Sequence, residues 1–420
     1  MTEQEVGNRV KAKPRFFYGY IIVIAAVIMR MAMISPRSSY GVFFKPMLNE
    51  FAWSRALISG AYSISSITQA LSGIIMGGLN DKLGPRLVMT ICGFVIGLGL
   101  LLMSQIGAAW HLYLLYVLVI GIGMGASFTP PMSTVVRWFV KRRSIMTGIV
   151  SAGGGLAGLM LPPAVNWLIS NYGWRNAYIA LGAIVLVIVI VTAQFLKRDP
   201  AQMGQVPYGD SKTEEPESNL FAEGLSLKEA IRSRQYWIAV SIFFCAGFSL
   251  STITVHIVPH ATDLGFSTGT AASILATVSG SFLVGGIMLG AIADRIGNRR
   301  GYIISFIIMA AALFWLLTVK EVQTLYLLAV VFGFGGGGAN TLESPLVAEL
   351  FGIRSHGLIL GSCSVFFLSG AAAGPFIAGY AYDVNGSYNW AFSACAVASI
   401  LGIILVTILR PVKRPATVKY

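Results

Sequence analysis

The stretch GGLNDKLGPR (residues 77–86) closes one long apolar run, and GAIADRIGNRR (residues 290–300) closes another. Both copies carry Gly, three further residues, Asp, a basic residue and then x-Gly-x-Arg. Asp81 and Asp294 stand about half of the 420-residue chain apart. A charged turn after an apolar helix is typical of a short cytoplasmic loop in a membrane protein. Its recurrence predicts a chain built from two similar halves.

The composition indicates that water is not the main solvent of this chain. Hydrophobic residues make up 55% and charged residues 11%, and the mean hydropathy is +0.74, whereas soluble domains carry about a quarter charged residues. The net charge of +13 does not indicate nucleic-acid binding, because the basic residues are divided among many short loops. Most of them precede the first apolar run, follow the last one or lie in even-numbered loops, which predicts two cytoplasmic termini. The exceptions are Arg30, Arg37, Lys45, Arg55, Arg175 and Lys320.

No metal, cofactor or cleaved leader is predicted. The four cysteines lie inside apolar runs without metal-ligand spacing, which also argues against a disulfide framework (Cys92, Cys245, Cys363 and Cys395). The basic N-terminus precedes an apolar segment far longer than a signal-peptide core, so we expect a retained first helix. With no nucleophile–base pair in view, the protein is not expected to be an enzyme.

Apolar runs of about 20 residues, enough to cross a bilayer, occur six times in each half. They lie near residues 17–45, 54–79, 86–105, 109–136, 143–170 and 174–196, and near 236–259, 268–293, 300–319, 322–349, 355–382 and 388–409. Backbone polar groups need partners in lipid, so these runs are expected to be helices. The predicted fold is an all-α membrane protein with twelve transmembrane helices in two six-helix bundles.

The same runs divide the chain into five regions. They are a cytoplasmic tail (1–16), a first bundle (17–197), a cytoplasmic linker (198–234), a second bundle (235–410) and a second cytoplasmic tail (411–420). The linker is polar and contains prolines, which is typical of a flexible segment. Near its end Ser226 and Glu229 have the spacing of a capping box, which predicts a short interfacial helix.

The repeated G-x-x-x-D-[RK]-x-G-x-[RK] pattern resembles the loop motif of the major facilitator superfamily. The stretches GVFFKPMLNEFAWSRALISGAYS (41–63), RWFVKRRSIMTGI (137–149), YGWRNAY (172–178) and VHIVPHATDLGFS (255–267) resemble prokaryotic monocarboxylate and oxalate:formate-type porters. The resemblance implies the major facilitator fold, a prokaryotic inner membrane, and small organic anions moved with a proton or against another anion. One departure is that residues 268–293 hold no basic residue for a substrate carboxylate.

Two repeats, glycine-interrupted helices and a dense glycine cluster at residues 333–338 are typical of alternating-access transporters. No G-x-x-x-x-G-K-[ST] sequence is present, so the energy is expected from an ion or substrate gradient. The leading hypothesis is a monomeric, proton-coupled transporter of monocarboxylate-like anions. Two alternatives stay open: an exporter of amphipathic or aromatic compounds, and a non-transporting membrane sensor.

Arg30 is the leading candidate for contact with substrate. It lies roughly 20 Å along the first helix, too deep to reach the surface, and ionisable groups at that depth are functional candidates by default. Arg37 falls on nearly the same face, and a guanidinium matches a carboxylate through two parallel hydrogen bonds. The alternatives are that Arg30 pairs with an internal carboxylate and that Arg37 already reaches the outer surface. Weaker substrate-binding candidates are Tyr62, Gln69 and Asn340.

Glu343 and His256 are the candidates for proton coupling. Glu343 is the acidic residue that lies well inside a helix of the second half. A carboxyl in apolar surroundings holds a proton more readily than one in water. A gating salt bridge and simple proximity to the cytoplasmic surface are the alternatives. His256 titrates in the physiological range, and its alternative is a purely local hydrogen bond.

The superfamily resemblance also implies a latch at the cytoplasmic side. In the superfamily the first motif Asp sits against the N-terminus of the eleventh helix, where the helix dipole favours a negative charge. Basic residues then complete the cluster. Carried over to this sequence, the latch comprises Asp81, Arg86 and Arg142, with Asp294, Arg295 and Arg300 as its repeat.

Overall fold

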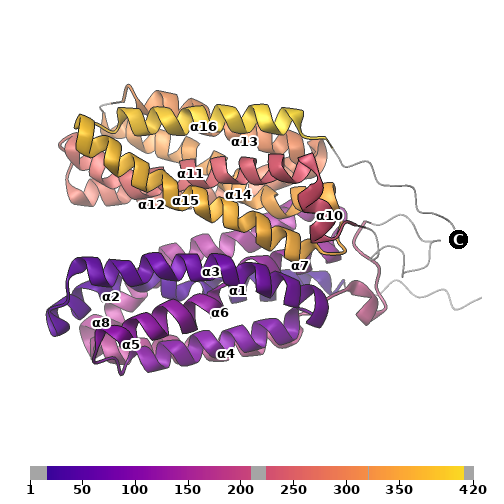
Figure 1. Cartoon of the computed structure of the whole chain (residues 1–420), viewed down its shortest axis with the longest axis horizontal. Helices are drawn as coiled ribbons and strands as arrows, with labels where there is room; N and C mark the ends of the chain where they lie inside the picture. Colours follow the sequence, from indigo (N-terminus) through magenta and orange to yellow (C-terminus); the bar gives the residue numbers. More distant parts are fainter. Residues whose placement is uncertain (1–16, 210–223, 320, 411–420) are drawn as a thin grey trace, which may run out of the picture.

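The computed structural model describes residues 17–209, 224–319 and 321–410, and most of these residues are helical (Figure 1). Within this part, extended pairing is limited to two isolated bridges, Phe139 with Tyr208 and Gly224 with Gly352. The predicted all-α fold is therefore confirmed.

The first half contains six spanning segments among the described residues. The first is formed by α1 (Gly19–Met33) and α2 (Ser35–Phe51), which are separated at Ile34, two residues before Pro36. Then follow α3 (Arg55–Leu83), α4 (Pro85–Met103), a composite of α5 (Ala109–Leu112), η1 (Tyr113–Ile120), α6 (Gly121–Met124) and α7 (Thr129–Trp138), and α8 (Arg143–Phe195). Gly173, with φ +80°, divides α8 into two spans.

The fourth span, expected at residues 109–136, is interrupted. Its chain leaves the helical path at residues 125–128, and Pro130 lies in the first turn of α7. Proline cannot donate a backbone hydrogen bond and clashes with a preceding helical turn, so a helix begins there more easily than it continues.

The second half repeats the plan after a short 3₁₀ turn, η2 (Pro200–Met203), and α10 (Leu227–Arg232). Its spans are α11 (Arg234–Asp263), α12 (Thr268–Ile296), α13 (Asn298–Leu316), α14 (Val322–Phe351), α15 (His356–Asn385) and α16 (Asn389–Ile408). The capping box predicted for Ser226 and Glu229 is present at the start of α10. Hydrogen bonds from Ser226 hold the pKa of the Glu229 carboxyl below its ordinary value.

The two halves form two helix bundles that lie side by side (Figure 1). They meet mainly where α3 packs on α15 and α8 packs on α12. We call the end that holds the two motif turns, α10 and Arg410 the linker end. Large apolar side chains on the outer helices are exposed, among them Phe94 on α4 and Val397 on α16, as expected for surfaces that face lipid.

Glycine is required in both motif turns because the backbone turns left-handed there. Gly84, with φ +84°, ends α3, and Gly297, with φ +94°, ends α12. A residue with a Cβ adopts such angles only with strain. The backbone N–H of each glycine donates to the helix it terminates, at Asn80 and Ala293. The shared conformation explains why the glycine occurs in both copies of the motif.

The bundles touch backbone to backbone near the linker end. A Cβ placed on Gly77 would lie 2.2 Å from the carbonyl oxygen of Gly357, and one placed on Gly148 would lie 2.6 Å from that of Gly286. Small residues permit such close helix crossings. The linker end is therefore closed by two helix crossings, α3 on α15 and α8 on α12. The two crossings are equivalent in the two halves of the chain.

Candidate functional site

Arg30 lies in the interior of the protein and not on the lipid-facing surface. Its residue is 8% exposed on α1, and its guanidinium carbon stands 4.7 Å from the centre of the Phe128 ring. A Cβ on Gly154 of α8 would lie 3.3 Å from Nε, so the guanidinium is held against α8. Nε has no hydrogen-bond partner in the described part of the chain. The buried cation thus retains unused capacity to donate.

Glu343, on the other bundle, is the carboxyl group that interacts electrostatically with Arg30. It is 2% exposed on α14, and its Oε1 has no partner among the described residues. The two side chains attract each other electrostatically, yet none of the ion pairs found among the described residues joins them. Isolated buried charges are costly. Because the cation and the carboxyl group are not directly paired, an anion can bind to the guanidinium and a proton can bind to the carboxyl group.

Arg37, Tyr62 and Gln69 lie together in the first bundle. Arg37 Nη1 donates to Gln69 Oε1 at 3.1 Å and to Ser66 Oγ at 3.4 Å, and the Arg37 guanidinium lies 5.3 Å from the centre of the Tyr62 ring. Gln69 Nε2 in turn donates to Ser127 Oγ at 3.3 Å. All these partners are neutral, so the positive charge of Arg37 is uncompensated in this network.

Asn340 and His256 occupy different surroundings. Asn340 is half-buried on α14, one turn before Glu343, and no hydrogen bond from it to a described residue is found. His256 Nε2 lies 2.9 Å from the carbonyl oxygen of Pro375, and its ring packs 5.0 Å from that of Tyr388. This is the local hydrogen bond that stood as the alternative for His256, so its proton-coupling role stays a prediction without support from these contacts.

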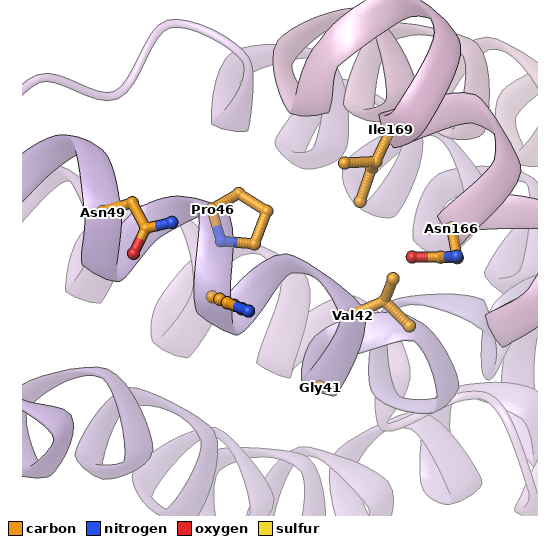
Figure 2. A pocket seen from close by; sticks show the side chains of 7 residues that line it. Gly41, Val42, Pro46, Asn49, Asn166 and Ile169 are labelled. Carbon is orange, nitrogen blue, oxygen red and sulfur yellow. The ribbon is translucent and has the colours of Figure 1, made fainter.

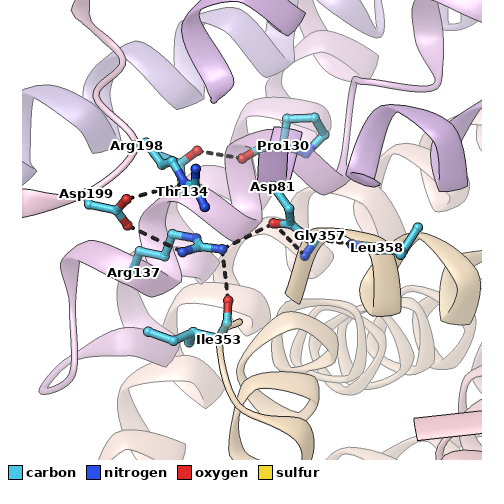
Figure 3. A network of polar contacts seen from close by, with 9 residues as sticks. All are labelled: Asp81, Pro130, Thr134, Arg137, Arg198, Asp199, Ile353, Gly357 and Leu358. Atoms are coloured by element: carbon cyan, nitrogen blue, oxygen red, sulfur yellow. Dashed lines mark hydrogen bonds and ion pairs between the residues drawn. The ribbon is translucent and has the colours of Figure 1, made fainter. Parts of the chain in front are cut away.

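Both motif aspartates cap helix N-termini of the opposite bundle. Asp81 accepts from the backbone N–H groups of Gly357 (3.2 Å) and Leu358 (2.9 Å) at the start of α15 (Figure 3). Asp294 accepts from those of Ser144 (2.8 Å) and Ile145 (2.9 Å) at the start of α8. A carboxylate is stabilised at this end of a helix. The capped residues are equivalent in the two halves: Ser144 precedes Gly357 in the sequence by the same number of residues as Asp81 precedes Asp294.

Arg137, and neither Arg86 nor Arg142, is the cation that pairs with Asp81. Its Nη2 lies 3.2 Å from the Asp81 carboxylate and donates to the Ile353 carbonyl at 2.8 Å, and its Nη1 lies 3.4 Å from Asp199 (Figure 3). The run RWFVKRR contains several basic residues. Which of them pairs with Asp81 depends on which side of α7 faces the other bundle.

The other predicted latch cations have different positions. Arg86 donates to Gln194 at 2.7 Å, and the guanidinium of Arg142 stacks 5.6 Å from the ring centre of Tyr208. Arg295 and Arg300 are exposed, with no ion pair found among the described residues. Around Asp294, Ser144 donates to Asn298, which donates to the Glu349 carboxylate, and the Arg143 guanidinium attracts both Asp294 and Glu349 electrostatically.

Replacing Arg137 with glutamine is expected to lower the melting temperature of the detergent-solubilised protein by several degrees. Its side chain is 2% exposed, and removing one partner of a buried ion pair costs about 3 kcal/mol or more, because the other charge stays buried. Scanning fluorimetry measures the effect. Arg86→Gln is the matched control, since it removes an exposed guanidinium with one neutral partner. Equal shifts for both variants would contradict the role given to Arg137.

A separate cavity of about 460 Å³ opens between α2 and α8 (Figure 2). Its lining is Gly41, Val42, Lys45, Pro46, Asn49, Asn166 and Ile169. Lys45 follows Arg30 and Arg37 along the same span, toward the end opposite the linker end. The first span therefore carries three cations between that end and the protein interior. No group of His, Cys, Asp or Glu side chains able to hold a metal occurs in the part of the chain that was described.

The chain is similar to known transporters along most of its length. The chain is 28% identical to Monocarboxylate transporter 13 of Rattus norvegicus over 398 residues, covering 93% of this chain and 89% of the relative. It is 27% identical to the Oxalate:formate antiporter of Oxalobacter formigenes over 417 residues, covering 95% and 94%. The resemblance to monocarboxylate and oxalate:formate porters is thereby confirmed.

Solved structures share the fold. The fucose:proton symporter of E. coli superposes with a TM-score of 0.71 at 15% identity, over 94% of this chain and all of that one. The proton:xylose symporter superposes with a TM-score of 0.72 at 14% identity, over 94% and 97%. A sequence model of the Major Facilitator Superfamily matches residues 20–290 and 240–419. With both halves matched and the fold shared, this multi-pass membrane protein belongs to the major facilitator superfamily.

Proposed function

We propose that the protein is a secondary active transporter of small, monocarboxylate-like organic anions, coupled to protons and working by alternating access. The observation that carries the proposal is the buried, incompletely paired Arg30 guanidinium facing Glu343 across the bundle boundary. The names of the relatives, a monocarboxylate transporter and an oxalate:formate antiporter, support a carboxylate as cargo.

Arg30 and Glu343 give a simple mechanism for coupling. When Glu343 is ionised, its charge offsets that of Arg30, and a substrate carboxylate must compete with it. When Glu343 takes up a proton, the guanidinium is free to bind the substrate through two parallel hydrogen bonds. Proton and anion therefore bind together more readily than either binds alone. Arg30 stands in for the basic residue that α12 lacks.

Alternating access requires that the two ends open in turn around this site. The linker end is closed by the glycine crossings and the two aspartate caps. The positive-inside pattern assigns this end to the cytoplasm, so in this conformation the site is closed to the cytoplasm. Opening the linker end would separate each aspartate from the helix N-terminus that it caps. The inner membrane of a prokaryote and a monomeric state remain parts of the proposal.

Ligand-dependent stabilisation of the purified protein tests the function. Short monocarboxylates are expected to raise the melting temperature more at the lower of two pH values, both above the pKa of the ligand. Glu343→Gln, which mimics the protonated carboxyl, should bind them tightly at both pH values. Coupling between sites typically changes affinity by roughly 5- to 150-fold. The apparent Kd of the wild type should therefore change by a factor of that order between the two pH values, and that of Glu343→Gln should not change.

Two outcomes of this experiment would contradict the proposal. Stabilisation by lipophilic cations and not by carboxylates would favour an exporter of amphipathic compounds. Stabilisation by no solute at either pH would favour a sensor that does not transport. A pH effect that persists in Glu343→Gln would transfer the coupling role to another group, with His256 as the next residue to replace.

A further inference from the structure

A second cavity lies at the linker end, on the outside of the second bundle. Its volume is about 470 Å³, and it is lined by Arg234, Gln235 and Ile238 of α11, Thr407 and Ile408 of α16, and Arg410. It lies away from the boundary between the bundles, since α11 packs against α16 within the second one. The transport mechanism proposed above does not use it.

The electrostatics of this cavity favour an anion. Arg234 and Arg410 are exposed, and neither takes part in an ion pair found among the described residues. Arg234 begins α11, a helix of 30 residues, whose N-terminal dipole adds positive potential. At the other wall Arg299 donates to the carbonyls of Val406 (2.8 Å) and Thr407. These bonds offset the negative end of α16, which would otherwise repel an anion.

The surroundings of the cavity fit a lipid better than a free anion. Ile408 lines it and continues an exposed apolar stripe up one face of α16, formed by Val397, Leu401, Ile404 and Ile408. Trp237, which precedes the lining residue Ile238 in α11, is 52% exposed and donates its indole N–H to the Ile231 carbonyl. Tryptophan is enriched at the depth of lipid headgroups. The cavity is thus placed where a headgroup meets the acyl chains.

We propose that this cavity binds the headgroup of an anionic phospholipid, with the acyl chains lying along the α16 stripe. Basic pockets between transmembrane helices at the cytoplasmic side suit such headgroups. The residues after Arg410 include Lys413, Arg414 and Lys419. Their positive charge makes these residues poor occupants of a basic cavity.

The test uses the full chain in detergent, titrated with phosphatidylglycerol or cardiolipin, and with phosphatidylcholine as the zwitterionic reference. Native mass spectrometry counts bound lipid, and scanning fluorimetry records the melting temperature. Each basic residue near an anionic lipid contributes enough to change affinity about fivefold. Arg234→Gln and Arg410→Gln should each weaken anionic-lipid binding by about that factor, and the double variant by about twenty-five-fold. Phosphatidylcholine binding should not change.

The matched control removes two charges from the same end, with Lys82→Gln and Lys228→Gln, both at exposed positions outside the cavity. It should bind anionic lipid as the wild type does. Wild-type affinity in the Arg234/Arg410 double variant, or an equal loss in the control, would overturn the site. Equal stabilisation by inorganic phosphate or glycerol 3-phosphate would overturn the lipid as its ligand. If the double variant does not fold, the two single variants carry the same comparison.

Discussion

Arg30→Gln is expected to abolish accumulation of the organic anion in proteoliposomes. The guanidinium is buried, Glu343 of the other bundle attracts it electrostatically, and its Nε lacks a partner in the described residues. In the proposed complex the guanidinium forms a buried, hydrogen-bonded charge pair with the substrate carboxylate. Removing one member of such a pair costs about 2–5 kcal/mol, so transport at low substrate concentration should fall on the order of a hundredfold or more. Uptake of labelled substrate driven by an imposed pH gradient measures the loss.

Three further variants separate binding from folding. Arg30→Lys keeps the charge but loses the planar two-bond geometry, so it should retain only part of the activity. Arg30→Gln combined with Glu343→Gln removes both buried charges, and should recover any stability lost in the single variant without recovering transport. Arg175→Gln removes a half-exposed arginine paired with Glu50 and should transport normally. Wild-type uptake in Arg30→Gln would refute the assignment of the site.

Gly77→Val is expected to prevent closure of the linker end and to stop transport. A Cβ at this position would lie 2.2 Å from the carbonyl oxygen of Gly357, a contact with backbone that no side-chain rotation relieves. Two packed helices cannot approach that closely with a branched side chain between them. The protein should therefore populate conformations in which α3 and α15 are apart at this end.

Spin labels on Lys82→Cys and Arg354→Cys, exposed positions on the two bundles, report this opening by pulsed electron resonance. The four native cysteines are buried and should label slowly. In Gly77→Val the distance between the labels should lengthen. Gly73→Ala is the matched control, because a Cβ there meets its nearest atom at an ordinary 3.6 Å. A short distance together with normal transport in Gly77→Val would contradict the proposed closure.

The features that could be predicted from sequence are those with local causes. Long apolar runs must be helical in lipid, and the twelve spans follow from that rule alone. The left-handed turns at Gly84 and Gly297 need residues without a Cβ, so the motif marks both turns directly. The capping box of Ser226 and Glu229 is likewise complete within one turn. The interruption before Pro130 follows a glycine-rich stretch and precedes a pair of prolines in the sequence.

Partners across the bundle boundary depend on the rotation of each helix about its own axis, which hydropathy specifies only loosely. The expected latch joined Asp81 to Arg86 and Arg142, but packing brings Arg137 onto Asp81 instead. His256 was a candidate for proton coupling, yet its ring nitrogen lies against a carbonyl inside its own bundle.

From its sequence alone this chain was determined to be a membrane protein of two similar six-helix halves, with an arginine deep in its first span. The tertiary structure decided that this arginine lies opposite Glu343, that Arg137 joins the Asp81 cap, and that two arginines line a cavity beside α16. The reason is physical. Burial in lipid and turn geometry act on neighbouring residues, whereas charges on different helices meet only after the helices have packed.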